Sequence, residues 1–361
     1  MEKLLFDIQK LLESMHYSIE EEKFNAYLFD KKNLSTAKYY NNNKVREKRE
    51  QLIFEQNKFN DAIYNALNEF DKMNIPIIGI KGIFVKDEYY NSYDRLFDDI
   101  DLLISSADAK NFFQGLKKLN YHIVWRTLYD FPNTCMRLIP QKYMDNTQTL
   151  MLKNSNNNIE IDLHSNLNIT NAHFTNSTTK FVTEELFKNS IPFKNYKNIR
   201  VFEIHDNICV LVRHLMKHHI FYGKTQSGLS TPIQHVLDLA FMLNSNNFNS
   251  EMLLSKSIDY NIVSETMFCL NIYNKIFKSG NMIDISPFLN ALKKAKGEFK
   301  WQKILTASLS MNVEDLMIGN FKENFPKLQD AVDFCESLHP DALNWCLQAL
   351  VLSLNIDKLI E

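Results

Sequence analysis

Short apolar runs between residues 75 and 170 constrain the fold of this chain more than any other feature. "IPIIGIKG" is rich in isoleucine and stops at a glycine, and "DDIDLLI" and "YHIVW" are equally short. Runs of this length and composition are typical of buried strands. "QTLMLKNSNNNIEIDLHS" predicts two further strands joined by an asparagine-rich turn. Because helical patterns ("IFVKDEYY", "SADAKNFFQGLKKLN") lie between the runs, we expect an α+β fold with a small mixed β-sheet.

The segments on either side of this unit show helical periodicity. Near the start of the chain, Leu4, Leu5, Ile8, Leu11 and Leu12 share one helical face. Beyond residue 204, "HDNICVLVRHLMKHHIFYG" and "PIQHVLDLAFMLN" have the same character. We therefore predict a helical N-terminal region at 1–74, a catalytic core at 75–200 and a helical C-terminal domain at 201–361.

Composition narrows the class of protein. The 41 basic and 43 acidic residues give a net charge of -2, without the basic excess typical of nucleic-acid-binding surfaces. The five cysteines are scattered and odd in number, which indicates reduced thiols and a cytoplasmic protein. The first residues mix charges into an amphipathic pattern unlike a signal peptide. No apolar run approaches the ~20 residues of a membrane span, so we expect no membrane partner.

Carboxylates gather on two of the predicted strands. Residues two apart on a strand point to the same face, so Asp99 and Asp101 project together. Such a pair repels itself unless a cation lies between the two side chains, and carboxylate oxygens suit Mg²⁺ or Mn²⁺. Asp162, which shares a face with Glu160 and His164, completes a three-carboxylate metal site if its strand lies beside the first. The alternative is that Asp99 and Asp101 are exposed residues on an edge strand.

The order of these motifs carries a resemblance. An apolar strand ending in Lys81-Gly82, then Arg95, then Asp99 and Asp101, resembles the signature of a bacterial nucleotidyltransferase family in the DNA polymerase beta-like superfamily. "EIDLHSNL", with Asp162 and His164, resembles a later motif of that family. "VRHLMKHH" and "VLDLAFML" resemble its helical half at His214, Lys217, His218 and Asp238. Many members of the superfamily have Gly-Ser where this chain has Lys81-Gly82.

The resemblance implies transfer of a nucleoside monophosphate from an NTP to a hydroxyl, phosphate or carboxyl group, with release of pyrophosphate. Asp99, Asp101 and Asp162 then hold the metals, and Asp162 is also the candidate base. Lys81 and Gly82 become candidate nucleotide-binding residues, because Gly82 can open a helix N-terminus near phosphate. Arg95 either contacts phosphate or locks the loop before the strand; a salt bridge to Asp94 or Asp98 is the structural alternative.

Several histidines are candidates for substrate binding. His164 can orient a metal ligand or contact substrate, although a lone strand histidine is more often packed and hydrogen-bonded. His214 and His218 lie one helical turn apart, a spacing that zinc tolerates, but no His-Glu-x-x-His pattern accompanies them. They either line an acceptor cleft between the sheet and the helical domain or pack, with Asp238 as a polar partner. "RHLMKHH" also matches the short Arg-x4-His motif of HEPN-type ribonucleases.

Three functions compete at this point. The first is a metal-dependent nucleotidyltransferase acting on a small molecule, peptide or protein; the family resemblance suggests natural-product or surface-polymer pathways. The second is a non-catalytic nucleotide-binding or regulatory protein on the same scaffold, which has no reason to keep three mutually repelling carboxylates. The third is a toxin-type enzyme modifying tRNA or a protein. The near-neutral charge argues against a long nucleic-acid acceptor.

Overall fold

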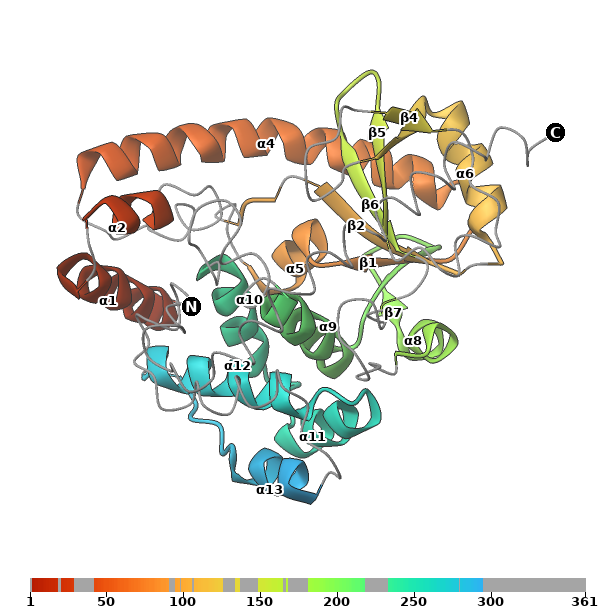
Figure 1. The fold of residues 1–361 in the computed structure, drawn as a ribbon. Helices are drawn as coiled ribbons and strands as arrows, with labels where there is room; N and C mark the ends of the chain where they lie inside the picture. Colours follow the sequence, from red (N-terminus) through yellow and green to blue (C-terminus); the bar gives the residue numbers. More distant parts are fainter. Residues whose placement is uncertain are drawn as a thin grey trace. The chain divides into compact units, whose positions relative to one another are not determined.

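The computed structural model describes residues 2–18, 21–28, 42–90, 95–97, 99–105, 107–125, 134–136, 149–164, 167, 181–217, 233–278 and 280–294. These residues form a mixed α+β structure, so the predicted fold class is confirmed (Figure 1). They group into two compact units. The sheet unit contains the described residues of Asn57–Asp87 and Phe97–Glu203, and the helical unit those of Met1–Gln56, Glu88–Leu96 and Ile204–Ser337. The three-part division at residues 74 and 200 stays a prediction.

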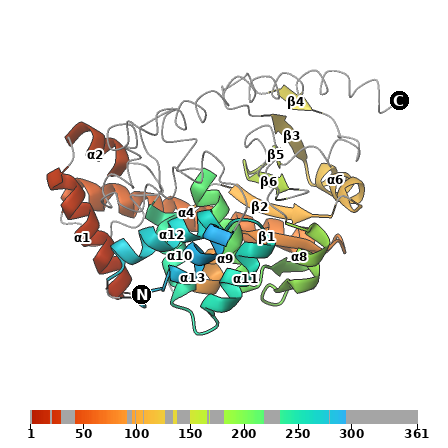
Figure 2. The same cartoon turned by 60° about the horizontal axis from the view of Figure 1, so that its bottom comes forward.

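The sheet unit is built on one eight-stranded mixed sheet. Its strands follow the order β4 (Thr134–Met136), β3 (Tyr121–Trp125), β5 (Thr149–Asn154), β6 (Glu160–His164), β2 (Asp99–Ile104), β1 (Ile77–Ile80), β8 (Ile199–Val201) and β7 (Ile191–Pro192). Figure 2 shows β4 to β1 following one another in this order. The β2–β6 and β1–β8 pairs are parallel, and the other pairs are antiparallel. The strands and the β5–β6 turn predicted from the short apolar runs are therefore confirmed.

One face of this sheet is covered by helices and forms the hydrophobic core of the unit. The covering helices are α4 (Asn43–Asp71), which contributes residues to both units, α5 (Gly82–Tyr89) and α6 (Ala109–Lys118). Leu67 and Phe70 of α4 and Phe112 of α6 are fully buried against the strands. On the strand side, the core receives Ile100, Leu102, Ile104, Ile161 and Leu163. Alternate residues of β2 and β6 thus point into the core, and the residues between them point to the opposite face.

The helical unit is packed around α10 (Ile233–Leu243), in which every residue is buried. α9 (Ile204–Lys217) contacts α10, α11 (Ser250–Asp259) and α12 (Val263–Ile276); α1 (Glu2–Ser18) contacts α2 (Glu21–Leu28), α10 and α12; and α13 (Ser286–Lys294) contacts α11 and α12. A short helix, α8 (Thr183–Asn189), precedes β7 in the sheet unit. A helix buried on all sides needs partners for any polar residue that it carries. In the described residues, no helix has the length and apolarity to cross a bilayer.

Candidate active site

The three predicted metal-binding carboxylates lie together on the sheet face opposite the helical cover. β2 and β6 are neighbours and run parallel, with Asp101 directly beside Asp162 and Asp99 beside Glu160. Directly paired residues on adjacent strands project to the same side, so Asp99, Asp101 and Asp162 share one face. The expectation that the Asp162 strand lies beside the Asp99–Asp101 strand is confirmed. The edge-strand alternative is wrong, because β2 lies between β6 and β1.

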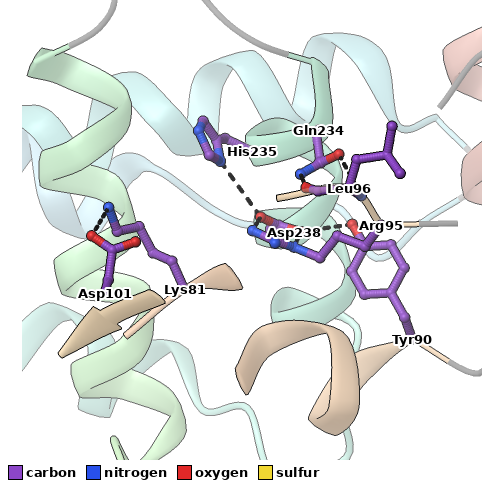
Figure 3. A network of polar contacts seen from close by, with 8 residues as sticks. All are labelled: Lys81, Tyr90, Arg95, Leu96, Asp101, Gln234, His235 and Asp238. Atoms are coloured by element: carbon purple, nitrogen blue, oxygen red, sulfur yellow. Dashed lines mark hydrogen bonds and ion pairs between the residues drawn. The ribbon is translucent and has the colours of Figure 1, made fainter. Parts of the chain in front are cut away.

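Lys81 stands at the end of β1, next to these carboxylates. β1 is antiparallel to β2 and pairs Ile80 with Asp101, so the chain passes Asp101 just as the strand ends. The chain then turns directly into α5, with Lys81 and Gly82 both in the left-handed backbone region, at φ values of 52° and 45°. The turn brings the Lys81 ammonium to 2.9 Å from Oδ1 of Asp101 (Figure 3). Gly82 begins α5 as predicted, and whether Lys81 and Gly82 bind nucleotide stays a prediction.

Asp101 is the centre of this group. Its side chain is almost fully buried. Its Oδ1 contacts both the Lys81 ammonium and, at 3.3 Å, Nε2 of His164. Burial alone would raise the pKa of Asp101, but the charge of Lys81 and the contact with His164 hold it well below its usual range. Asp101 is therefore ionised at neutral pH. His164 contacts a predicted metal ligand, and its contact with substrate stays a prediction.

The charge of Lys81 is stabilised by all three carboxylates. Burial would lower the pKa of the ammonium, but the negative charges of Asp101, Asp99 and Asp162 together raise it above its ordinary value. A second lysine, Lys153 on β5, contacts Glu160 at 3.1 Å on the same sheet face. Glu160 thus has a lysine partner of its own, and Asp99, Asp101 and Asp162 share Lys81.

The donors at this site suit a hard divalent cation. Carboxylate oxygens are the ligands that Mg²⁺ and Mn²⁺ prefer, and three of them lie on adjacent strands of one face. Within the described part of the chain, no three acidic, histidine or cysteine side chains already stand in a metal-holding arrangement. Instead, the cation beside Asp101 is the Lys81 ammonium. The residue types therefore fit the metal, and the side chains have to rearrange around Lys81 to hold it.

Arg95 and Asp238 bind each other in the interior of the helical unit. The guanidinium donates from Nε to Oδ1 of Asp238 at 2.8 Å and from a terminal nitrogen to Oδ2 at 2.7 Å (Figure 3). Arg95 is 1% exposed and Asp238 is fully buried. Burial would raise the pKa of Asp238, but Arg95 and His235 hold it well below its ordinary value.

The contact between Arg95 and Asp238 bears on two predictions. Of the two roles considered for Arg95, locking the chain before the strand matches this placement, and its contact with phosphate stays untested. The salt-bridge alternative named Asp94 and Asp98, which both lie outside the described residues; the observed partner is Asp238. The predicted substrate contact of Asp238 likewise stays untested.

Tyr90, Gln234 and His235 complete this cluster, and the sequence did not identify Gln234 and His235 as site partners. The Tyr90 hydroxyl donates to Oδ1 of Asp238 at 2.6 Å, and Nδ1 of His235 lies 3.5 Å from Oδ2. The Gln234 side-chain amide makes two hydrogen bonds with the backbone of Leu96: it accepts from the N–H at 3.2 Å and donates to the carbonyl at 2.5 Å. The sequence did hold a signal, since Gln234 and His235 precede Asp238 by four and three residues and share its helical face.

The remaining predicted histidines are only partly placed. His214 on α9 is half-buried, and its ring meets the ring of His235 edge-on at a centroid distance of 4.9 Å. His218 lies outside the described residues, as does His219. The paired role predicted for His214 and His218 therefore stays a prediction.

Comparison with known proteins assigns the chain to a family. The model of one family, described as uncharacterised nucleotidyltransferase, matches residues 7–278. The chain belongs to this family. The match runs through both units and contains Lys81, all three carboxylates and the Arg95–Asp238 pair. A search of curated proteins gave no match.

Proposed function

We propose that this chain is a metal-dependent nucleotidyltransferase of the DNA polymerase beta-like type. Such an enzyme moves a nucleoside monophosphate from an NTP to a small-molecule, peptide or protein acceptor. The single observation that carries the proposal is the parallel register of β2 and β6, which sets Asp101 beside Asp162 with Asp99 on the same face. Membership of a nucleotidyltransferase family supports the reaction class.

The bond changes of this reaction assign roles to the residues. An acceptor oxygen forms a bond to the α-phosphorus. The bond from that phosphorus to the oxygen bridging the α- and β-phosphates breaks, and pyrophosphate leaves with the electron pair. Asp162 is the candidate base for the acceptor proton, and Lys81 is the nearby cation that can contact phosphate oxygens. Asp99, Asp101 and Asp162 would hold Mg²⁺, which stabilises the charge that develops on the transferring and leaving groups.

The test compares NTP binding and NMP transfer in three proteins. Calorimetry with each NTP, with and without Mg²⁺, is followed by a screen of acceptors with α-labelled NTP and by detection of pyrophosphate. Asp99→Asn/Asp101→Asn removes two charges at nearly constant shape, and Asp61→Asn, on an exposed position of α4, is the matched control. We expect Mg²⁺-dependent binding and transfer in wild type and Asp61→Asn, with both lost in the double variant. Equal nucleotide binding by all three proteins, without transfer, would instead support a non-catalytic nucleotide-binding protein.

A further inference from the structure

The backbone at Lys81 is in a conformation that lysine rarely adopts. In the described residues, the positive-φ positions other than glycine are four asparagines (Asn74, Asn120, Asn158, Asn261) and two lysines, Lys81 and Lys194. Asparagine tolerates the left-handed region because its short side chain bonds locally, whereas a lysine there is strained. Strain of this kind persists where the surrounding structure imposes it, and it clusters at functional sites. At Lys81, the left-handed turn accompanies a contact between its ammonium and Asp101, and this contact is the feature to explain.

The ammonium occupies the position that matters most for metal binding. It contacts Oδ1 of Asp101 at 2.9 Å, and the Lys81 side chain is only 13% exposed. The negative charges of Asp99 and Asp162 also stabilise the charged form of Lys81. One ammonium against three carboxylates leaves a net negative site, to which a divalent cation is still attracted. A cation that binds Oδ1 of Asp101 must nevertheless displace the ammonium from that oxygen.

A displaced Lys81 ammonium needs a new counter-charge. Leaving it buried beside an incoming divalent cation is costly, because like charges repel strongly where water is excluded. The triphosphate of an NTP supplies several negative oxygens, and a lysine ammonium binds phosphate as a point charge. Metal entry and triphosphate entry are therefore each easier when the other has occurred.

We propose that Lys81 is an exchangeable internal cation: it neutralises Asp101 while the site holds no metal, and it moves onto the triphosphate when metal and nucleotide bind. The inference rests on the proposed function and adds cooperativity to it: metal alone binds weakly, and metal together with NTP binds strongly. Coupling between two ligands is reciprocal, so NTP strengthens metal binding by the same factor by which metal strengthens NTP binding.

The test measures Mn²⁺ binding to the full chain by electron paramagnetic resonance of the free ion, with and without a non-hydrolysable NTP analogue. Lys81→Met removes the ammonium. Lys153→Met is the matched control, because Lys153 lies on the same sheet face but contacts Glu160. Lys81→Gly is a second variant that removes the ammonium and also relieves the left-handed backbone. Thermal unfolding in EDTA and in Mn²⁺ accompanies each titration.

In the absence of nucleotide, we expect Lys81→Met and Lys81→Gly to bind Mn²⁺ ~10-fold more tightly than wild type, and the analogue to strengthen Mn²⁺ binding less in them than in wild type. Lys153→Met should match wild type. Lys81→Met should unfold at a lower temperature than wild type in EDTA, with a smaller difference in Mn²⁺. Unchanged or weaker Mn²⁺ binding in both Lys81 variants would overturn the exchange while leaving the metal site intact. Failure of every protein to bind Mn²⁺, even with the analogue, would overturn the proposed function as well.

Discussion

The Arg95–Asp238 pair makes a strong prediction about stability. Two charge-assisted hydrogen bonds of 2.8 and 2.7 Å join side chains that are 1% exposed and fully buried. Asp238→Ala leaves a buried guanidinium without its counter-charge, and breaking such a pair from one side typically costs ~3–5 kcal/mol. Asp238→Ala should therefore lower the free energy of unfolding of the helical unit by about 3 kcal/mol or more.

The reasoning also predicts that removing both charges is milder than removing one. Arg95→Met/Asp238→Leu replaces the pair by apolar side chains of similar size, which is often near neutral for a buried pair. We expect this double variant to recover at least ~2 kcal/mol relative to Asp238→Ala. Two compact units can unfold separately, so the assay is hydrogen exchange of α10 amides, which reports the opening free energy of that helix. A loss below ~1 kcal/mol in Asp238→Ala, or a double variant less stable than it, would refute a buried, paired Arg95.

Three further predictions concern pH and backbone. The depressed pKa of Asp238 contributes stability that is present above its unfolded pKa of ~3.9 and is lost as pH falls below that value. Hydrogen exchange of the α10 amides, measured as the pH is lowered, should show this loss in wild type and little of it in Asp238→Asn. Burial raises the pKa of Glu265 to about 7, so the folded state binds its proton more tightly and stability falls as pH rises from ~4.3 through 7. Glu265→Gln should flatten that decline in thermal melts at pH 5 and 8, and a steeper decline would contradict a neutral Glu265. Gly82→Ala should lower the free energy of unfolding in urea by ~1 kcal/mol, because Gly82 has a φ of 45°. Gly115→Ala is the comparison, because there the added methyl group meets the side chain of Met73 without a positive φ.

Local pattern was enough to predict five of the eight strands and the carboxylates on them, but not β4, β7 or β8. In "DIDL" and "EIDLH", apolar residues alternate with polar ones, and this alternation decides which of these side chains enter the core. The adjacency of the two strands came from strand pattern together with the family resemblance, and the register now confirms it. The positions of single elements followed from local pattern too, since "PIQHVLDLAFMLN" contains α10 and "IPIIGIKG" contains β1.

Long-range partners could not be predicted from local pattern. The sequence offers Asp94 and Asp98 as neighbouring partners for Arg95, yet the observed partner, Asp238, is 143 residues away. Which distant carboxylate meets a given guanidinium depends on how the helices pack, and periodicity carries no information about that. The ion pair of Lys81 with Asp101 likewise cannot be predicted from local pattern, because it depends on the left-handed turn at the end of β1.

The parallel pairing of β2 and β6 also governs when this site can exist. Asp101 and Asp162 lie side by side in the sheet, but they are far apart along the chain. α6, β3, β4 and β5 all lie between β2 and β6 in the sequence, and β5 forms a hairpin with β6. Contacts between residues so distant in sequence close large loops and raise the contact order, which slows folding. We therefore expect the three carboxylates to come together after the local helices and hairpins have formed. A nascent chain emerging from the ribosome holds Asp99 and Asp101 long before it holds Asp162, so the three carboxylates can meet only after β6 has been synthesised.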